Sequence, residues 1–250
     1  MLNSIGLQNP GIDAFVEESL PRIAELGVPI WVSVGGFSAP DYADVCERLD
    51  GEASVEVIEL NLSCPNVEEA PETAAELVAA ARAATTKPLY AKLSPTTWDV
   101  AESARAVAGA GADGLSLVNT IRGLELDTAT LRPKLARGPG GYSGPALRPI
   151  ALACVYACAR SVDLPIVGMG GVVSGSDALD LVAAGASAVA LGTILFSDPW
   201  APTRVREELD AAVRSQGVAS ASEIRGAAHE STSPAIASTG LTTPKALQML

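Results

Sequence analysis

The sequence predicts an α/β fold of the (β/α)8 barrel type, truncated to about six βα units, and three observations lead to this prediction. Short apolar runs alternate with helical patterns in units of roughly 25 to 45 residues, as in βα repeats. Each apolar run ends abruptly in small or polar residues, as a buried parallel strand does at the C-terminal mouth of a barrel. Six such runs are present, whereas a closed barrel has eight strands.

The first half of the chain supplies four of these strands. An amphipathic helix is predicted over residues 13–26, because Phe15, Leu20 and Ile23 recur on one side. No strand pattern precedes it, so we expect the first two strands of the ancestral barrel to be missing, through truncation or a misassigned start. Apolar runs closed by glycine or polar residues predict strands at 28–34, 55–60, 88–93 and 113–118. Helical patterns predict helices at 39–49, 71–85 and 97–110.

The second half supplies the other two strands. Residues 121–144 are rich in glycine and read as an irregular stretch, long enough to act as a lid over the mouth. Periodicity then predicts a helix at 145–160, a strand at 165–169, a helix at 176–184, a strand at 186–191 and a helix at 201–213. We therefore predict a barrel domain over 1–230. Residues 231–250 lack periodicity and are predicted to be a disordered tail.

Charge and composition limit the class of protein. The net charge of -12 disfavours nucleic acid and anionic membranes as partners. No apolar run is long enough to cross a bilayer, and the N-terminus lacks a secretory signal, so we expect a cytoplasmic protein. No cluster of cysteine and histidine suggests a metal. His229 is the single histidine, so a general base would be Cys, Lys, Tyr or a carboxylate.

The stretch 59–66, ELNLSCPN, places a thiol and two amides at the end of a strand. Amide side chains of Asn61 and Asn66 can hold a neutral heterocycle by paired contacts, and the Cys64 thiol can move a proton. The alternative is a loop with a buried cysteine. The flanking amides favour the functional interpretation. Because a free thiol titrates near about 8.5, activity should rise toward mildly alkaline pH.

Further polar groups end the other strands. Glycines at 168–171 and Gly192-Thr193 close the last two strands, where bare backbone N–H groups often bind a phosphate. Lys92 could stabilise negative charge on a cofactor or substrate, or form a structural ion pair. Asn119-Thr120 could bind a ligand or cap a turn. Together these groups fit a nitrogen heterocycle lying against a flavin, with a thiolate taking a proton while hydride goes to the flavin.

These residues resemble the class 1 dihydroorotate dehydrogenases, flavoenzymes of pyrimidine biosynthesis. The resemblance runs from residue 2 to about residue 228. Its motifs are NSIGLQNPG at 3–11, NLSCPN at 61–66, KLSP at 92–95, LVNT at 117–120, GGYSGPALRPIAL at 140–152, GMGG at 168–171 and LGT at 191–193.

The resemblance implies a role for each matching position. Cys64 is implied to be the base that takes the C5 proton of dihydroorotate while FMN accepts hydride from C6. The implied orotate-binding set is Asn3, Ile5, Gly6, Leu7, Asn61, Asn66, Asn119 and Thr120. The implied FMN-binding set is Asn61, Lys92, Val118, Gly144, Gly170, Gly171, Gly192 and Thr193. No metal site is implied.

The GGYSGPAL segment and the Asn-Thr pair are most similar to the NAD-linked 1B subclass. That similarity implies a partner subunit carrying FAD and a 2Fe-2S cluster, and a homo-oligomer or heterotetramer. Two departures stand out. The family's first two strands, with a lysine that contacts flavin and substrate, have no counterpart, and Ser33 replaces a usual Asn.

Three other interpretations stay open at this point. The chain could be the flavin half of a dihydropyrimidine dehydrogenase, acting on dihydrouracil. It could be a fragment that is inactive until a partner completes the barrel. It could also be a phosphate-binding barrel without redox chemistry.

Overall fold

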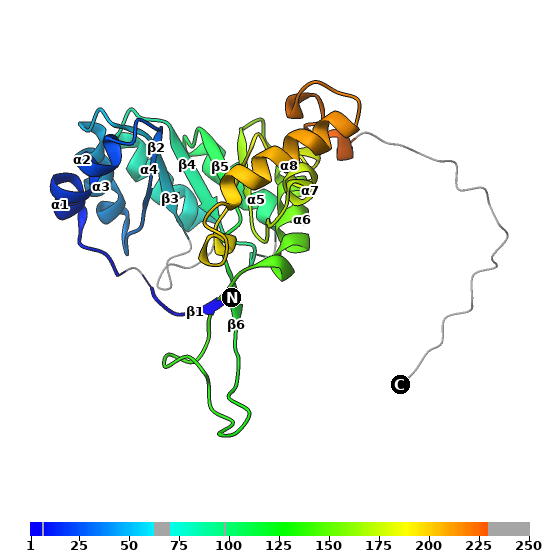
Figure 1. Cartoon of the computed structure of the whole chain (residues 1–250). Coiled ribbons are helices and arrows are strands. Elements are labelled where there is room, and N and C mark those ends of the chain that lie inside the picture. The colour runs from blue at the N-terminus through cyan, green and yellow to red at the C-terminus, as the bar shows by residue number, and fades with distance from the viewer. Residues whose placement is uncertain (7, 63–70, 98, 230–250) are drawn as a thin grey trace, which may run out of the picture.

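A curled sheet of six parallel strands forms the centre of the molecule (Figure 1). The computed structural model describes residues 1–6, 8–62, 71–97 and 99–229. The strand order is β2-β3-β4-β5-β8-β9, so each strand pairs with its neighbour along the barrel. These strands are β2 Ile30–Val34, β3 Val55–Asn61, β4 Leu89–Leu93, β5 Gly114–Leu117, β8 Ile166–Met169 and β9 Ala188–Ala190. All six predicted strands are confirmed.

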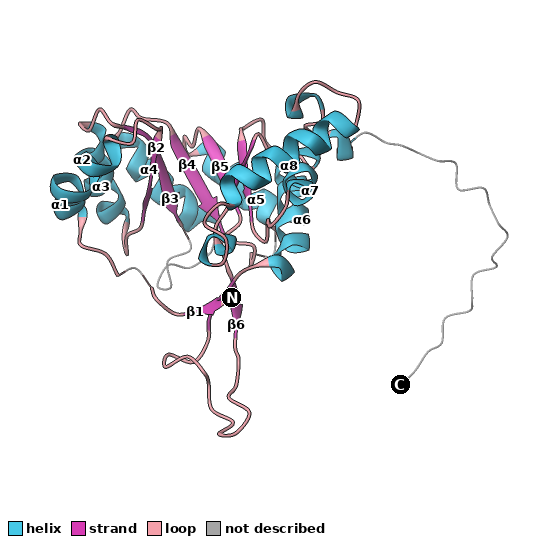
Figure 2. Cartoon of the chain, in the orientation of Figure 1, coloured by secondary structure: helices cyan, strands magenta, loops and turns pink. Residues whose placement is uncertain are grey.

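Helices follow the strands and surround the curled sheet (Figure 2). They are α3 Ala39–Asp50, α4 Pro71–Ala84, α5 Val100–Gly109, α6 Arg148–Ala159, α7 Gly175–Ala183 and α8 Ala201–Ser215. The predicted N-terminal helix is present as three consecutive segments, α1 Ile12–Ala14, the π-helical η1 Phe15–Ser19 and α2 Leu20–Ala24. Short 3-10 turns complete the list at η2 Pro145–Leu147, η3 Thr193–Phe196, η4 Ala221–Glu223 and η5 Ala227–His229. None of the helices in these described ranges is both long and apolar enough to cross a membrane.

Strand alternation separates the core from the concave face of the sheet. Ile58 and Leu60 of β3 are fully buried in the hydrophobic core. Glu59 and Asn61 alternate with them, and the side chains of successive strand residues point to opposite faces. The register of the parallel strands sets Glu59 beside Ser33 and Asn61 beside Lys92. Polar side chains of three neighbouring strands therefore lie close together on the concave face, on two successive levels.

The edges of the described sheet are β2 and β9. Near the N-terminal end of β2, Trp31 is 44% exposed and packs against Tyr90, with ring centroids 4.8 Å apart. The sheet is thus a barrel wall with two free edges within the described residues. This agrees with the prediction of about six βα units.

Three short strands form a second, antiparallel sheet that the sequence did not predict. In it β1 Leu2–Asn3 pairs with β7 Gly140–Tyr142, which pairs with β6 Ile121–Gly123. Residues 121–144 were expected to be irregular throughout, and this expectation was wrong at both ends. These strands are too short to carry a period, and β1 lies 138 residues from its partner (Asn3 opposite Gly141). A Cβ on Gly140 would lie 2.2 Å from the Asn3 carbonyl oxygen, so only glycine permits this approach.

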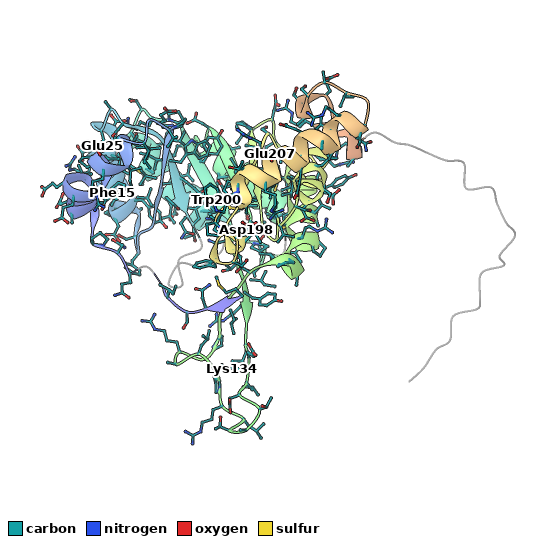
Figure 3. The ribbon with its side chains drawn as sticks, in the orientation of Figure 1. Phe15, Glu25, Lys134, Asp198, Trp200 and Glu207 are labelled. Carbon is teal, nitrogen blue, oxygen red and sulfur yellow. The ribbon has the colours of Figure 1, made fainter. Side chains whose placement is uncertain are left out.

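The segment between β6 and β7 projects away from the curled sheet as an arm, with Lys134 along it (Figure 3). Its leucines at 124, 126 and 131 are exposed. The arm's base, through the pairing of β7 with β1, holds the loop after Asn3 on the same side of the molecule as the strand ends (Figure 1).

Candidate active site

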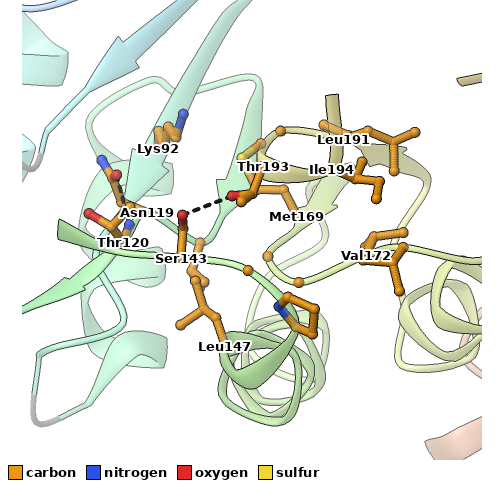
Figure 4. Close-up of a pocket in the computed structure, with 18 of the residues that line it drawn as sticks. Lys92, Asn119, Thr120, Ser143, Leu147, Met169, Val172, Leu191, Thr193 and Ile194 are labelled. Atoms are coloured by element: carbon orange, nitrogen blue, oxygen red, sulfur yellow. Dashed lines mark hydrogen bonds between the residues drawn. The ribbon is translucent and has the colours of Figure 1, made fainter. Parts of the chain in front are cut away.

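The C-terminal ends of β4, β5, β8 and β9 surround a cavity of about 500 Å³, which we call the first cavity (Figure 4). This size lies within the usual range for small-molecule sites, roughly 300–1,000 Å³. Of the residues predicted to bind the cofactor, all except Asn61 line it: Lys92, Val118, Gly144, Gly170, Gly171, Gly192 and Thr193. Asn119 and Thr120, predicted to bind the substrate, line it as well. Nine predicted residues, from several strand ends and loops, therefore line one cavity.

Glycines shape the end of the first cavity that lies between β8 and β9. Gly171 has a φ of +75°, and a Cβ there would lie 2.7 Å from the Arg148 nitrogen and 2.8 Å from the Gly144 oxygen. Only glycine allows the chain to turn this closely past the start of α6. At Gly192 a Cβ would meet no atom within 4 Å, so this backbone faces open space. Phosphate sites commonly use backbone N–H groups that are accessible in this way.

The rest of the cavity wall suits a flat aromatic group. Leu147, Met169, Val172, Leu191 and Ile194 provide apolar surface. Thr193 and Ser143 hydroxyls are joined by a 2.8 Å hydrogen bond at the glycine end (Figure 4). An apolar wall with a polar, glycine-lined end fits the two parts of FMN, a ring system and a phosphate. The residues present therefore fit the predicted cofactor.

Two asparagines meet at the mouth, although 58 residues separate them. Asn119 Nδ2 donates to Asn61 Oδ1 at 2.8 Å, and Asn119 Oδ1 accepts from the Thr120 N–H at 2.8 Å. The capping alternative for Asn119 is thus partly right, because its oxygen does hold the following turn. The Asn61 backbone oxygen accepts from the Tyr42 hydroxyl at 2.6 Å, which ties the end of β3 to α3.

A second cavity, of about 600 Å³, adjoins the end of β3. Asn61, Ser33 and Gly6 line it, so it includes two residues of the predicted substrate set. Its apolar wall comes from the N-terminal helices and β2: Ile12, Phe15, Ile23, Val28, Ile30, Trp31 and Val32. Two hydrogen bonds connect the two cavities, because Asn61 bonds to Asn119 and Ser33 bonds to Glu59.

Lys92 forms an ion pair within the first cavity, 3.4 Å from Glu59 Oε1. The sequence left two alternatives for this lysine, a ligand contact or a structural ion pair. The ion pair exists, and it lines the cavity, so the two alternatives are compatible. Glu59 itself was not predicted. Its alternation with Asn61 along β3 is the signal that could have found it.

The remaining predicted residues fall into two groups. Leu7, Cys64 and Asn66 lie outside the described residues, as does the predicted tail at 231–250. Asn3 ends β1, where its Nδ2 donates to the Gly141 oxygen of β7 at 3.4 Å, and Ile5 lies in the loop that follows and is 67% exposed. Their predicted contact with a substrate stays a prediction.

The other cysteines are structural. Burial raises the pKa of Cys46 to about 12, of Cys154 to about 11 and of Cys158 to about 12. All three thiols lie in the hydrophobic core. A thiol with so high a pKa is a poor base near neutral pH.

Comparison with known proteins identifies the family. The family profile "Dihydroorotate dehydrogenase" matches residues 1–213. Two curated relatives are catalytic subunits of dihydroorotate dehydrogenase B (NAD(+)). The one from Citrifermentans bemidjiense is 44% identical over 91% of this chain and 77% of its own length. The one from Geobacter sulfurreducens is 45% identical over the same shares.

Among solved structures, the ligand-free DHODH of Eimeria tenella superposes with a TM-score of 0.77 at 22% identity, covering 92% of this chain and 74% of that one. This likeness confirms the barrel fold that the sequence predicted. The sequence matches go further, because they cover most of the chain at well over 40% identity in several bacterial relatives. The chain therefore belongs to the dihydroorotate dehydrogenase family, whose members are oxidoreductases.

Proposed function

We propose that this chain is an FMN-dependent enzyme that oxidises dihydroorotate to orotate in pyrimidine biosynthesis. The observation that carries the proposal is the convergence of the predicted cofactor residues on one cavity, next to the Asn61–Asn119 pair. Membership of the dihydroorotate dehydrogenase family supports the same reaction.

The cavity residues divide the work of binding. Gly171, Gly192 and Thr193 offer backbone and hydroxyl groups to the cofactor phosphate, since bare N–H groups favour anions. Leu147, Met169 and their apolar neighbours hold the ring system and exclude water. The amides of Asn61 and Asn119 contact the pyrimidine, because each amide can both donate and accept.

The reaction breaks two C–H bonds of the substrate and makes one C=C bond. Cys64 takes the proton from C5, and the electron pair released forms the double bond to C6. FMN supplies the oxidising power when bound, since it accepts the hydride that leaves C6. Lys92 provides a positive charge in the cavity that favours the negative charge arriving with the hydride.

We also infer that the chain works with a second subunit. The relatives named above are catalytic subunits of an NAD(+)-linked enzyme, and the resemblance implies a partner with FAD and a 2Fe-2S cluster. Assembly as a homo-oligomer or heterotetramer stays a prediction that rests on this resemblance. A cytoplasmic location stays a prediction from the sequence.

Substrate choice tests the proposal. Purified protein supplemented with FMN should convert dihydroorotate to orotate in the presence of an artificial electron acceptor, with the product identified by chromatography. Dihydrouracil lacks the carboxylate and should react far more slowly. Faster oxidation of dihydrouracil would instead support a dihydropyrimidine dehydrogenase, and oxidation of neither would contradict the proposed activity.

A further inference from the structure

The most informative group outside the predicted set is the carboxylate of Glu59. This residue is 8% exposed and lines the first cavity. Its Oε1 accepts a hydrogen bond from the Ser33 hydroxyl at 2.9 Å and lies 3.4 Å from Lys92 Nζ. Burying a charge is costly unless it is paired and hydrogen-bonded, and both forms of compensation are present here.

The neighbours of Glu59 define what it does. Among the described residues Lys92 is its one ion-pair partner, and the Lys92 side chain is 22% exposed. Their strands β3 and β4 are adjacent, so both side chains are held by the sheet and not by a loop. A cation fixed in this way cannot follow a ligand freely, and a carboxylate beside it cancels part of its field.

We propose that Glu59 is a positioning residue that fixes Lys92 in the cavity and partly neutralises it. The electron affinity of the bound flavin then depends on the Glu59–Lys92 pair together. The hydrogen bond from Ser33 determines how much of the Lys92 charge the Glu59 carboxylate neutralises. The inference rests on the proposed function, because it needs a flavin in the first cavity. It extends that function, because it makes the charge pair, and not the lysine alone, the element that tunes the cofactor.

The charges of Glu59 and Lys92 determine in which direction each substitution changes the stability of the reduced flavin. Reduction by hydride leaves negative charge on the flavin, and nearby positive charge stabilises it. The substitution Glu59→Gln keeps the shape of the side chain and removes its negative charge. Lys92 then acts uncompensated, so the reduced flavin is stabilised. Ser33→Ala should destabilise the reduced flavin instead. Without the Ser33 hydrogen bond, the Glu59 carboxylate neutralises more of the Lys92 charge.

Sulfite affinity of the flavin-loaded protein tests this without using turnover. Sulfite donates an electron pair to oxidised flavin and leaves negative charge on the ring, so its affinity reports the local field. We expect Glu59→Gln to bind sulfite about tenfold more tightly than the unmodified protein, which corresponds to a rise of about 30 mV for a two-electron couple. The flavin reduction potential, measured against a reference dye, should rise by a similar amount.

The chain offers a matched control. Glu56 lies on the same strand with its side chain exposed on the opposite face. The same change there, Glu56→Gln, should leave sulfite affinity unaltered. Equal sulfite affinities in the unmodified, Glu59→Gln and Glu56→Gln proteins would overturn the inference, and so would weaker binding in Glu59→Gln.

A second variant keeps the inference testable if Glu59→Gln fails to fold. Ser33 is exposed, so Ser33→Ala should fold normally. We expect this variant to bind sulfite about two- to threefold more weakly, because only a small part of the effect of one hydrogen bond to a charged group is transmitted through Lys92 to the flavin. Unchanged or tighter binding would overturn the inference. Unmodified protein that takes up no flavin would refute the proposed function and this inference with it, whereas flavin uptake with unresponsive variants would refute the inference alone.

Discussion

Asn119 donates a 2.8 Å hydrogen bond from Nδ2 to Oδ1 of Asn61, across the ends of β3 and β5. The contact joins the first cavity, which Asn119 lines, to the second, which Asn61 lines. Ser33 and Glu59 make a second connection of the same kind. The two cavities therefore share a polar wall.

Asn119→Ala should weaken orotate binding about tenfold. The variant removes one amide and leaves Asn61 Oδ1 without its donor, and one such hydrogen bond contributes about 1 to 1.5 kcal/mol. The measurement is a titration of the flavin spectrum with orotate. Gln216→Ala, at an exposed position beyond α8, provides the control. Equal orotate affinity in both variants would show that the Asn61–Asn119 pair does not contribute to substrate binding.

Gly171→Ala should lower FMN affinity and stability together. Its Cβ would collide with the Arg148 nitrogen at 2.7 Å, in addition to the strain of a φ of +75°. Gly217→Ala is a matched control, because its φ is +78° and no atom lies within 4 Å of the added Cβ. The control should cost only the left-handed strain, about 1 to 2 kcal/mol. Thermal unfolding and FMN titration of both variants measure the difference, and identical losses would show that packing around Gly171 is unimportant.

The buried thiols make stability fall at alkaline pH. Burial raises the pKa of Cys46, Cys154 and Cys158 above that of a free thiol, to about 12, 11 and 12. Above about pH 9 the unfolded chain loses these protons while the native protein keeps them, so the free energy of unfolding decreases as pH rises. Below pH 9 the effect is absent. Three groups give a slope of at most about 4 kcal/mol per pH unit.

Urea unfolding between about pH 8 and pH 10.5 measures this slope. Cys158→Ala removes one of the three groups and should reduce the slope by about a third, whatever its effect on stability at pH 8. An unfolding free energy that is constant over this range would contradict the assignment of all three thiols to the core.

Cys64→Ser should abolish most turnover while leaving FMN binding intact. A hydroxyl is a much weaker base than a thiolate, and general base catalysis contributes about 10²- to 10⁴-fold. The turnover of the unmodified protein should rise with pH as the thiol ionises, near about pH 8.5 if its pKa is ordinary. A flat pH–rate profile, or a serine variant of full activity, would remove Cys64 from the role of base.

The local sequence pattern was sufficient to predict the strands of the barrel but not those of the small antiparallel sheet. The strands Val55–Asn61 and Leu89–Leu93 are mostly apolar and are followed by polar residues, so both could be recognised directly from the sequence. The pairing of Asn3 with Gly141 depends on contact between distant segments of two or three residues, which no local period records.

The site shows the same division. Glycines and asparagines at strand ends were found because strand ends of a parallel sheet meet at one mouth. Glu59 was missed because a single charged residue within an apolar strand is usually interpreted as a solvent-exposed side chain. Its value becomes visible only when the register places Ser33 beside it and Lys92 on the next strand.

The most direct test of a flavin facing a pyrimidine in this mouth is the visible absorbance of the purified, FMN-loaded protein under anaerobic conditions, recorded before and after adding dihydroorotate. We predict that the flavin absorbance bleaches on addition and returns when an electron acceptor is supplied. A protein that retains FMN but keeps its full absorbance with dihydroorotate would contradict the account.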